Sequence, residues 1–392
     1  MNDKIYWIWL QQALGINTSI RTDEIVSYFG SARALYFAGE TEWRLSGIFT
    51  ARQIAKLGNQ DLTKSENIFK TCVKNNWQVV TPVDGDYPSM LFKLPNFPLV
   101  LYVNGDLDCL KNKITIAVVG TRKPTLNSAH IARRLSASLT RSGALVVSGG
   151  ALGIDSESHI GALETGGKTV AVLGCGLDCT YPVANIALRK QISENGALVT
   201  EFPPGTAGVA PNFPIRNRII SGLSYGTLVI EAGEKSGSLI TANHALEQGR
   251  DVFAVPGDIL FSGFNGANKL IRDGAKPVFS ALDVLGEYAM VYPDLIRAED
   301  IETVLRMGEY KADTTPQKTV PKEEPKPLEK SEPEGLSENA RKVYRAFENC
   351  EMQMEELIMK TGLGVSAFAC AMTELELFDL VELQAGKNYK LK

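Results

Sequence analysis

The stretch ITIAVVG at residues 114–120 is apolar or small at almost every position and runs directly into TRKP at residues 121–124. Five further runs have the same character: ALVVSG (144–149), TVAVLG (169–174), ALVTE (197–201), TLVIE (227–231) and DVFAV (251–255). Strands that stay apolar without alternation are typical of a parallel sheet covered on both faces. Helical patterns fill the gaps, as at 128–141 and 239–248, so the sequence predicts an extended Rossmann-like α/β domain.

This domain is expected to span residues 76–290 of the 392-residue chain, with further segments on either side. Residues 1–75 carry short helical patterns broken by glycines and predict a helical bundle of the SAM-like or helix-hairpin-helix-like kind; the turn LSGI at 45–48 is either a DNA contact or a packing turn. Residues 291–335 combine acidic residues with five prolines between residues 311 and 335, and indicate a linker. Residues 336–392 predict three helices and a hairpin, which is a winged-helix-like domain.

Composition excludes several classes of protein. With 44% hydrophobic and 22% charged residues, the chain can bury a core and is not disordered throughout. Six cysteines are too few for a disulfide framework, so we expect a reduced, cytoplasmic protein with neither signal peptide nor membrane span. The formal charge of −4 gives no global attraction to nucleic acid, but residues 113–285 hold 16 Lys and Arg against 13 Asp and Glu. Any site for a polyanion must therefore be local.

The loop after the first strand contains residues suited to an anion. Gly120 allows a backbone to approach a phosphate closely, and Thr121 can donate a hydrogen bond. Arg122 offers a planar guanidinium that matches phosphate oxygens, and Lys123 adds a second cation. We therefore expect this loop to bind phosphate.

Two further glycine-rich loops follow the next two strands. Gly149 and Gly150 come after the second strand, and residues 174–178 after the third, while Asp155 is expected to cap the helix after the second loop. Because the carboxyl ends of parallel strands meet at one edge, the three loops are expected to converge. Glycines that only serve tight strand-to-helix turns are the alternative. Neither loop completes a dinucleotide fingerprint, and this argues against a dehydrogenase. The GKT sequence at 167–169 leads into a strand, and this argues against a P-loop ATPase.

The stretch NFPIRNRIISGL at 212–223 places Arg216, Asn217 and Arg218 at the start of a predicted helix. A positive helix end with two added cations suits an anion, and together with Arg122 and Lys123 these residues would form a phosphate track. Pairing of both arginines with protein carboxylates is the alternative. Tyr181 and Phe213 can supply stacking faces for unpaired bases, although a core position suits Phe213 equally well.

Catalytic groups are scarce. The three histidines form no metal-ligating spacing, and we expect no metal and no cofactor. Glu231, at a strand end, is the best candidate for a reactive carboxylate, and a structural hydrogen-bonding role is its alternative. A nucleotide-processing enzyme related to phosphoribohydrolases, with Glu231 acting, is the alternative to a protein that only binds, but the PGGxGT-type loop that it needs is absent.

The set of loops resembles the DNA-processing protein DprA (Smf) family. The resemblance rests on residues 120–122, 148–155, 174–178 with 181–182, 213–223, 231–232 with 236–241, and 249–257, in order. It implies a non-enzymatic protein that binds single-stranded DNA without sequence preference, forms a homodimer and loads RecA during natural transformation and recombination. It also places the family's phosphate-contacting arginine on Arg122 and its Arg-Asn-Arg motif on residues 216–218.

The same resemblance places a dimer surface around Leu246 and Ile271. Where some members carry a lysine after Tyr-Pro, this chain has Val183, and Arg189 or Lys190 is the cation that could replace it. The C-terminal segment also departs from expectation. A winged helix that reads duplex DNA uses a basic third helix, yet residues 361–386 contain neither Lys nor Arg. With Glu374, Glu376 and Asp379 there, we predict a protein-interaction or regulatory module.

Overall fold

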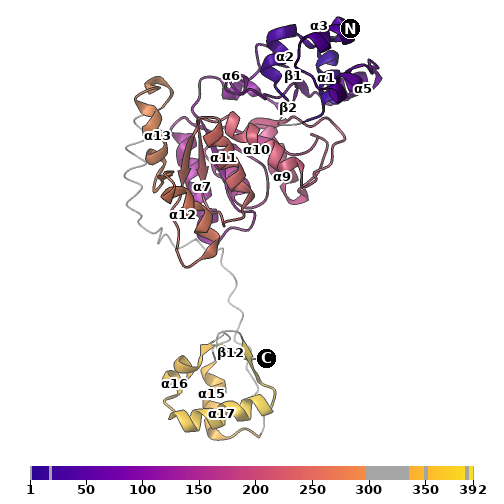
Figure 1. The fold of residues 1–392 in the computed structure, drawn as a ribbon. Coiled ribbons are helices and arrows are strands. Elements are labelled where there is room, and N and C mark those ends of the chain that lie inside the picture. Colours follow the sequence, from indigo (N-terminus) through magenta and orange to yellow (C-terminus); the bar gives the residue numbers. More distant parts are fainter. Residues whose placement is uncertain (1, 17–19, 297–334, 348–351, 385–387, 392) are drawn as a thin grey trace. The chain divides into compact units, whose positions relative to one another are not determined.

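A computed structural model describes residues 2–16, 20–296, 335–347, 352–384 and 388–391 (Figure 1). The chain divides into two compact units, with the division near residue 311. Most of the predicted linker, residues 297–334, lies outside the described residues. No helix of the described residues is both long enough and apolar enough to cross a membrane.

The first unit is built on a sheet of nine strands in the order β1-β2-β6-β5-β4-β3-β7-β8-β9. The seven strands β3 to β9 run parallel, whereas β1 and β2 add an antiparallel edge. The strands are β1 (Gln78–Val80), β2 (Leu101–Gly105), β3 (Thr115–Val119), β4 (Leu145–Ser148), β5 (Thr169–Leu173), β6 (Gly196–Thr200), β7 (Gly226–Val229), β8 (Asp251–Ala254) and β9 (Lys276–Pro277). All six predicted runs are confirmed as β3 to β8, whereas β1, β2 and β9 were not predicted.

Both faces of the sheet are buried, as the continuous apolar runs require. In β3, Ile116 and Val118 belong to one hydrophobic cluster, and the alternating Ala117 and Val119 belong to another. The helices between and after the strands are α6 (Ser89–Phe92), α7 (Leu126–Arg141), α8 (Ile154–Glu164), α9 (Ile186–Glu194), α10 (Asn212–Gly222), α11 (Gly237–Glu247), α12 (Asn265–Arg272) and α13 (Ala281–Ala289). The predicted α/β architecture is therefore confirmed.

The N-terminal helices share a core with this sheet instead of enclosing one of their own. They are α1 (Lys4–Leu14), α2 (Thr22–Phe29), α3 (Ala32–Leu45), α4 (Ala51–Leu57) and α5 (Thr63–Lys74). Trp7 and Trp43 lie in one cluster with Tyr102 of β2 and Leu198 of β6. Figure 1 shows the bundle gathered beside β1 and β2. In the turn at 45–48, the following Phe49 is buried in this cluster, which favours packing.

The second unit contains α15 (Glu338–Ala346), α16 (Met354–Thr361) and α17 (Val365–Leu377) with a small sheet. Its strands β10 (Met352–Gln353), β11 (Val381–Gln384) and β12 (Asn388–Leu391) pair in the order β10-β12-β11. Val343, Phe368 and Leu375 form its core. The three predicted helices and the hairpin are confirmed, while the turn at 385–387 lies outside the described residues.

The strand order fixes where a ligand can bind. Successive strands β3 to β6 run outward in one direction, and the chain then returns to place β7 on the other side of β3. The loops after β3 and β7 therefore leave the sheet toward opposite sides and open a crevice between them. Ligands of open α/β sheets bind at such a switch point.

Candidate nucleic-acid interface

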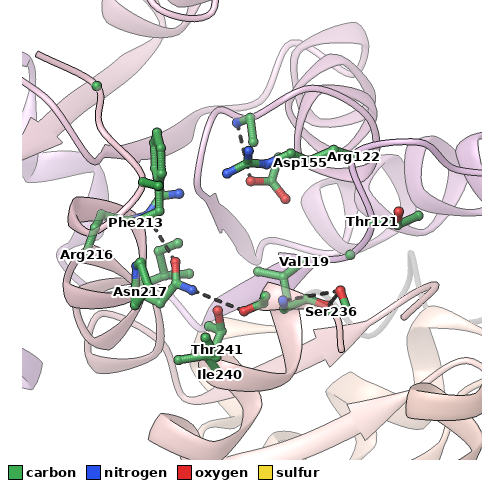
Figure 2. A pocket seen from close by; sticks show the side chains of 18 of the residues that line it. Val119, Thr121, Arg122, Asp155, Phe213, Arg216, Asn217, Ser236, Ile240 and Thr241 are labelled. Carbon is green, nitrogen blue, oxygen red and sulfur yellow. Dashed lines mark hydrogen bonds between the residues drawn. The ribbon is translucent and has the colours of Figure 1, made fainter. Parts of the chain in front are cut away.

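A cavity of about 670 Å³ lies at this switch point. Figure 2 shows Thr121 and Arg122 on one side of it, and Asn217 and Thr241 on the other. Its lining comes from the loop after β3, the N-terminal parts of α8, α10 and α11, and the loop that carries Tyr181. Of the predicted site residues, it is lined by Gly120, Thr121, Arg122, Lys123, Tyr181, Phe213, Arg216 and Asn217.

Arg122 lies at the exposed rim of the cavity and stacks on an aromatic face. Its guanidinium carbon is 4.9 Å from the centre of the Phe213 ring, and the Tyr181 ring is 5.8 Å from that of Phe213. Among the described residues, Arg122 forms no ion pair with a carboxylate. Lys123 next to it is also exposed. The rim thus presents unneutralised cations beside two aromatic rings, one of which, Tyr181, is 44% exposed.

Arg216 also lines the cavity, but its hydrogen bonds go to the protein. Its Nη1 donates to the carbonyl oxygen of Gly149 at 2.5 Å and to that of Val172, and its Nε donates to Asn217. Burial lowers its pKa to about 10, with Asp155 nearby opposing the shift. Arg216 therefore joins the loop after β4 to strand β5, in addition to adding positive charge to the cavity wall.

The prediction that Arg218 joins Arg122 at the rim is wrong. Arg218 is buried, and its Nη2 donates to both carboxylate oxygens of Glu201, at 2.8 and 2.6 Å. Residues two apart on an α-helix point about 200° apart, so Arg216 and Arg218 face opposite sides of α10. The alternative of pairing with a protein carboxylate therefore holds for Arg218. Asn217 between them faces the cavity and donates to the Gly237 carbonyl at 3.2 Å.

The glycines allow the loops to pack against one another. A Cβ on Gly149 would lie 2.6 Å from Oδ2 of Asp155, and one on Gly153, whose φ is +80°, would lie 2.5 Å from the Thr121 carbonyl oxygen. Gly150 lines a small second cavity next to the first one. The contacts at Gly149 and Gly153 leave no room for a side chain. The close approach observed is between parts of the protein itself, a packing role that was not predicted from the sequence.

The sequence predicted that Asp155 caps α8, and this prediction is wrong. Gly153 holds the N-cap position, and Asp155 in the first turn accepts a hydrogen bond from the Ala151 amide at 3.3 Å. Burial raises the pKa of Asp155, and Arg216 opposes that shift.

Glu231 is held away from the cavity. Its buried carboxylate accepts hydrogen bonds from the amide and the hydroxyl of Thr125, both at 3.0 Å, and so anchors the N-terminus of α7. This geometry favours the structural role over the reactive one. Within the described residues, no group of three or more His, Cys, Asp and Glu side chains is arranged to hold a metal ion.

Two residues beside the cavity have a structural role that was not recognised from the sequence, where Arg189 was expected only as a possible phosphate-binding cation. Asn185 and Arg189 lie four residues apart, and both are buried with their donors on loop carbonyls. Arg189 is thus not free to replace the phosphate-binding lysine that some family members carry where this chain has Val183. Lys190 is exposed, and its Nζ lies 3.9 Å from Oε1 of Glu194. Their spacing of one helical turn after Tyr-Pro was the available signal.

The residues expected at a dimer surface lie on α11 and α12, away from the cavity. Leu246 is 58% exposed and lines a separate hollow of about 340 Å³, while Ile271 is partly buried against the core.

Comparison with known proteins gives the family. The family described as DNA recombination-mediator protein A matches residues 78–289, and the DprA winged helix domain matches residues 325–387. The chain belongs to the DprA (Smf) family. This confirms the resemblance of the loops and the winged-helix fold of the C-terminal unit.

Relatives match over different lengths. Protein Smf from Synechocystis is 32% identical over 401 residues, which cover 99% of each chain. DNA processing protein DprA from Streptococcus pneumoniae is 44% identical over 206 residues, 53% of this chain and 72% of that one.

Two solved structures are similar. The X-ray structure of the Streptococcus pneumoniae protein has a TM-score of 0.64 at 34% identity and covers 73% of this chain and 98% of that one. DNA processing protein A from Helicobacter pylori, for which a unique single-stranded DNA binding mode is described, has a TM-score of 0.50 at 28% identity and covers 55% of this chain and 97% of that one.

Proposed function

We propose that this protein binds single-stranded DNA without sequence preference at the cavity between the β3 and β7 loops. The observation that carries the proposal is the guanidinium of Arg122 at the rim, which stacks on Phe213 and has no carboxylate partner within the part of the chain that the structure describes. A phosphate can approach Arg122, Lys123 and the Thr121 hydroxyl, while the bases on either side of it meet the faces of Phe213 and Tyr181. Every base has such a face, so this mode of binding does not select sequence.

Binding without bond cleavage fits the groups in the cavity. Asp155 is the one carboxylate among the described residues that line it, and this side chain is buried against Arg216 and the Ala151 amide. Glu231, on which the enzyme alternative depended, is held by Thr125. We therefore infer a binding protein and do not favour the phosphoribohydrolase-like enzyme.

The family's description as a recombination mediator supports a further step. We propose that the bound strand is passed to RecA, and that the protein acts as a homodimer through the surface around Leu246 and Ile271. Because unpaired DNA that enters a cell during transformation is the substrate of such loading, natural transformation and recombination are the proposed setting. Filament formation by purified RecA on an oligonucleotide already covered by single-strand binding protein, with and without this chain, tests the loading.

The experiment that tests the binding step is a titration of single-stranded and double-stranded oligonucleotides at two salt concentrations. We expect tighter binding to the single strand, weakening as salt rises with a log-log slope of about 0.7 for each phosphate contacted. Equal affinity for both forms, or affinity independent of salt, contradicts the proposal. Release of a free base from nucleoside monophosphates would instead establish the enzyme.

A further inference from the structure

Helix α9 and the 3₁₀ turn before it share one face that supports two glycine-rich loops beside the cavity, the loop after β4 and the loop after β5. Asn185 ends that turn, Val183–Asn185, and is 5% exposed. Its amide Nδ2 donates to the carbonyl oxygens of Gly150 and Ala151, at 3.0 and 3.1 Å. Arg189 follows one helical turn later and is 6% exposed. The two side chains therefore project from the same face toward the two loops.

Arg189 uses its guanidinium on three backbone carbonyls of a single loop. Nη1 donates to Cys179 at 2.6 Å and to Tyr181 at 3.2 Å, and Nη2 donates to Leu177 at 3.5 Å. Among the described residues, no carboxylate forms an ion pair with it. A buried cation is costly unless its donors are satisfied, so its hydrogen bonds tie the loop to the helix.

This loop carries one of the two aromatic faces of the cavity. The Tyr181 ring lies 5.8 Å from the Phe213 ring at an interplanar angle of 42°. Gly208 closes the other side, where a Cβ would come within 3.1 Å of Tyr181 Cδ1. Tyr181 is therefore held at its carbonyl by Arg189 and at its ring by Phe213 and Gly208.

We propose that Arg189 is a positioning residue for single-stranded DNA, which fixes Tyr181 as the second stacking face without touching the strand. The proposal rests on the function proposed above. Without the three hydrogen bonds the Tyr181 loop is free to move, and ordering it on binding lowers affinity. The phosphate contacts stay the same, so the salt dependence is unchanged. A cation that contacts phosphate directly behaves differently, because its removal flattens the salt dependence.

The first test needs no DNA. Hydrogen exchange of the backbone amides at 175–181 is measured in the full-length protein, in Arg189→Met and in the matched control Lys190→Met, which removes the exposed cation next along the helix. We expect faster exchange in Arg189→Met alone. Equal exchange in all three proteins overturns the proposal. Arg189→Lys, which keeps the charge but cannot span three carbonyls, replaces Arg189→Met if the latter does not fold, with a smaller change in the same direction.

The second test is a double-mutant cycle with Tyr181→Ala, read by titration with labelled oligothymidylate at several salt concentrations. We expect Arg189→Met to weaken binding about fivefold to tenfold in the wild-type background, with an unchanged slope, and less than about twofold in the Tyr181→Ala background. The proposal is overturned if Arg189→Met weakens binding by the same factor in both backgrounds, so that the two losses of affinity multiply. It is also overturned if Arg189→Met lowers the slope of the salt dependence by about 0.7. A wild-type protein that binds no strand removes the proposed function as well, whereas multiplying losses in a protein that binds overturn this proposal alone.

Discussion

The rim around Arg122 and the interior around Arg218 use the same functional group in opposite ways. Arg122 is exposed, stacks on Phe213 and has no carboxylate partner among the described residues. Arg218 is buried in a bidentate pair with Glu201, and its Nη1 also donates to the Asn96 carbonyl. A guanidinium that the protein has already neutralised contributes to folding, and one left unpaired at a rim is available to a ligand. The comparison predicts that changes in the interior alter stability and changes at the rim alter binding.

The largest effect is expected from Arg218→Met. This change leaves the Glu201 carboxylate buried without its partner, which costs about 3–5 kcal/mol of unfolding free energy. Chemical denaturation measures it. The matched control is Arg44→Met, which breaks an exposed pair with Glu40 and should change stability little. If Arg218→Met were as stable as the control but bound DNA more weakly, interior and rim would not differ as described.

The next effect is a dependence of stability on pH through His159. Burial lowers the pKa of this histidine to about 3, and Arg216 adds to the shift. Because the unfolded chain binds the proton near pH 6.5 and the folded chain does not, this contribution to stability is present above that pH and is lost as the pH falls toward 3. From pH 7 to pH 5 the wild type should lose about 2 kcal/mol more than His159→Gln, measured by denaturation at both pH values. Equal losses would show that the buried imidazole accepts the proton.

A substitution at the rim should alter DNA binding and leave stability nearly unchanged. Arg122→Ala is expected to weaken binding to a single strand about tenfold and to lower the salt slope by about 0.7, because one charge-assisted phosphate contact is lost. Unfolding free energy should change by no more than about 0.5 kcal/mol, since the side chain is exposed. Titration at several salt concentrations and a denaturation curve give both numbers. An unchanged slope would remove Arg122 from the site.

The smallest effect is expected from deleting residues 336–392. Residues 361–386 offer no Lys or Arg to a phosphate, and Glu374, whose pKa is lowered by hydrogen bonds from Ser337, remains charged. We therefore expect the shortened chain to bind duplex and single-stranded DNA as the full chain does. If the deletion abolished duplex binding, the C-terminal unit would be a DNA reader and not the protein-interaction or regulatory module that we propose.

The central strands could be predicted because each is buried on both faces, so apolar residues fill the run without interruption. The edge strand β1 has three residues, too few for a pattern to stand out. In the site, Arg122 could be predicted because it directly follows a strand. The direction of Arg218 follows from helix geometry, but its partner Glu201 is set by tertiary packing. The spacing of Asn185 and Arg189 indicates a shared helix face, but their structural role could not be recognised until the loops that accept their hydrogen bonds had been placed.

Photo-crosslinking tests the central claim most directly. An oligothymidylate with bromouracil in place of single thymines is irradiated in complex with the full-length protein, and the modified residue is identified by mass spectrometry. If the rim beside Arg122 holds the unpaired strand, adducts form on Tyr181 or Phe213. Adducts found only among the N-terminal helices or within residues 336–391 would contradict the account.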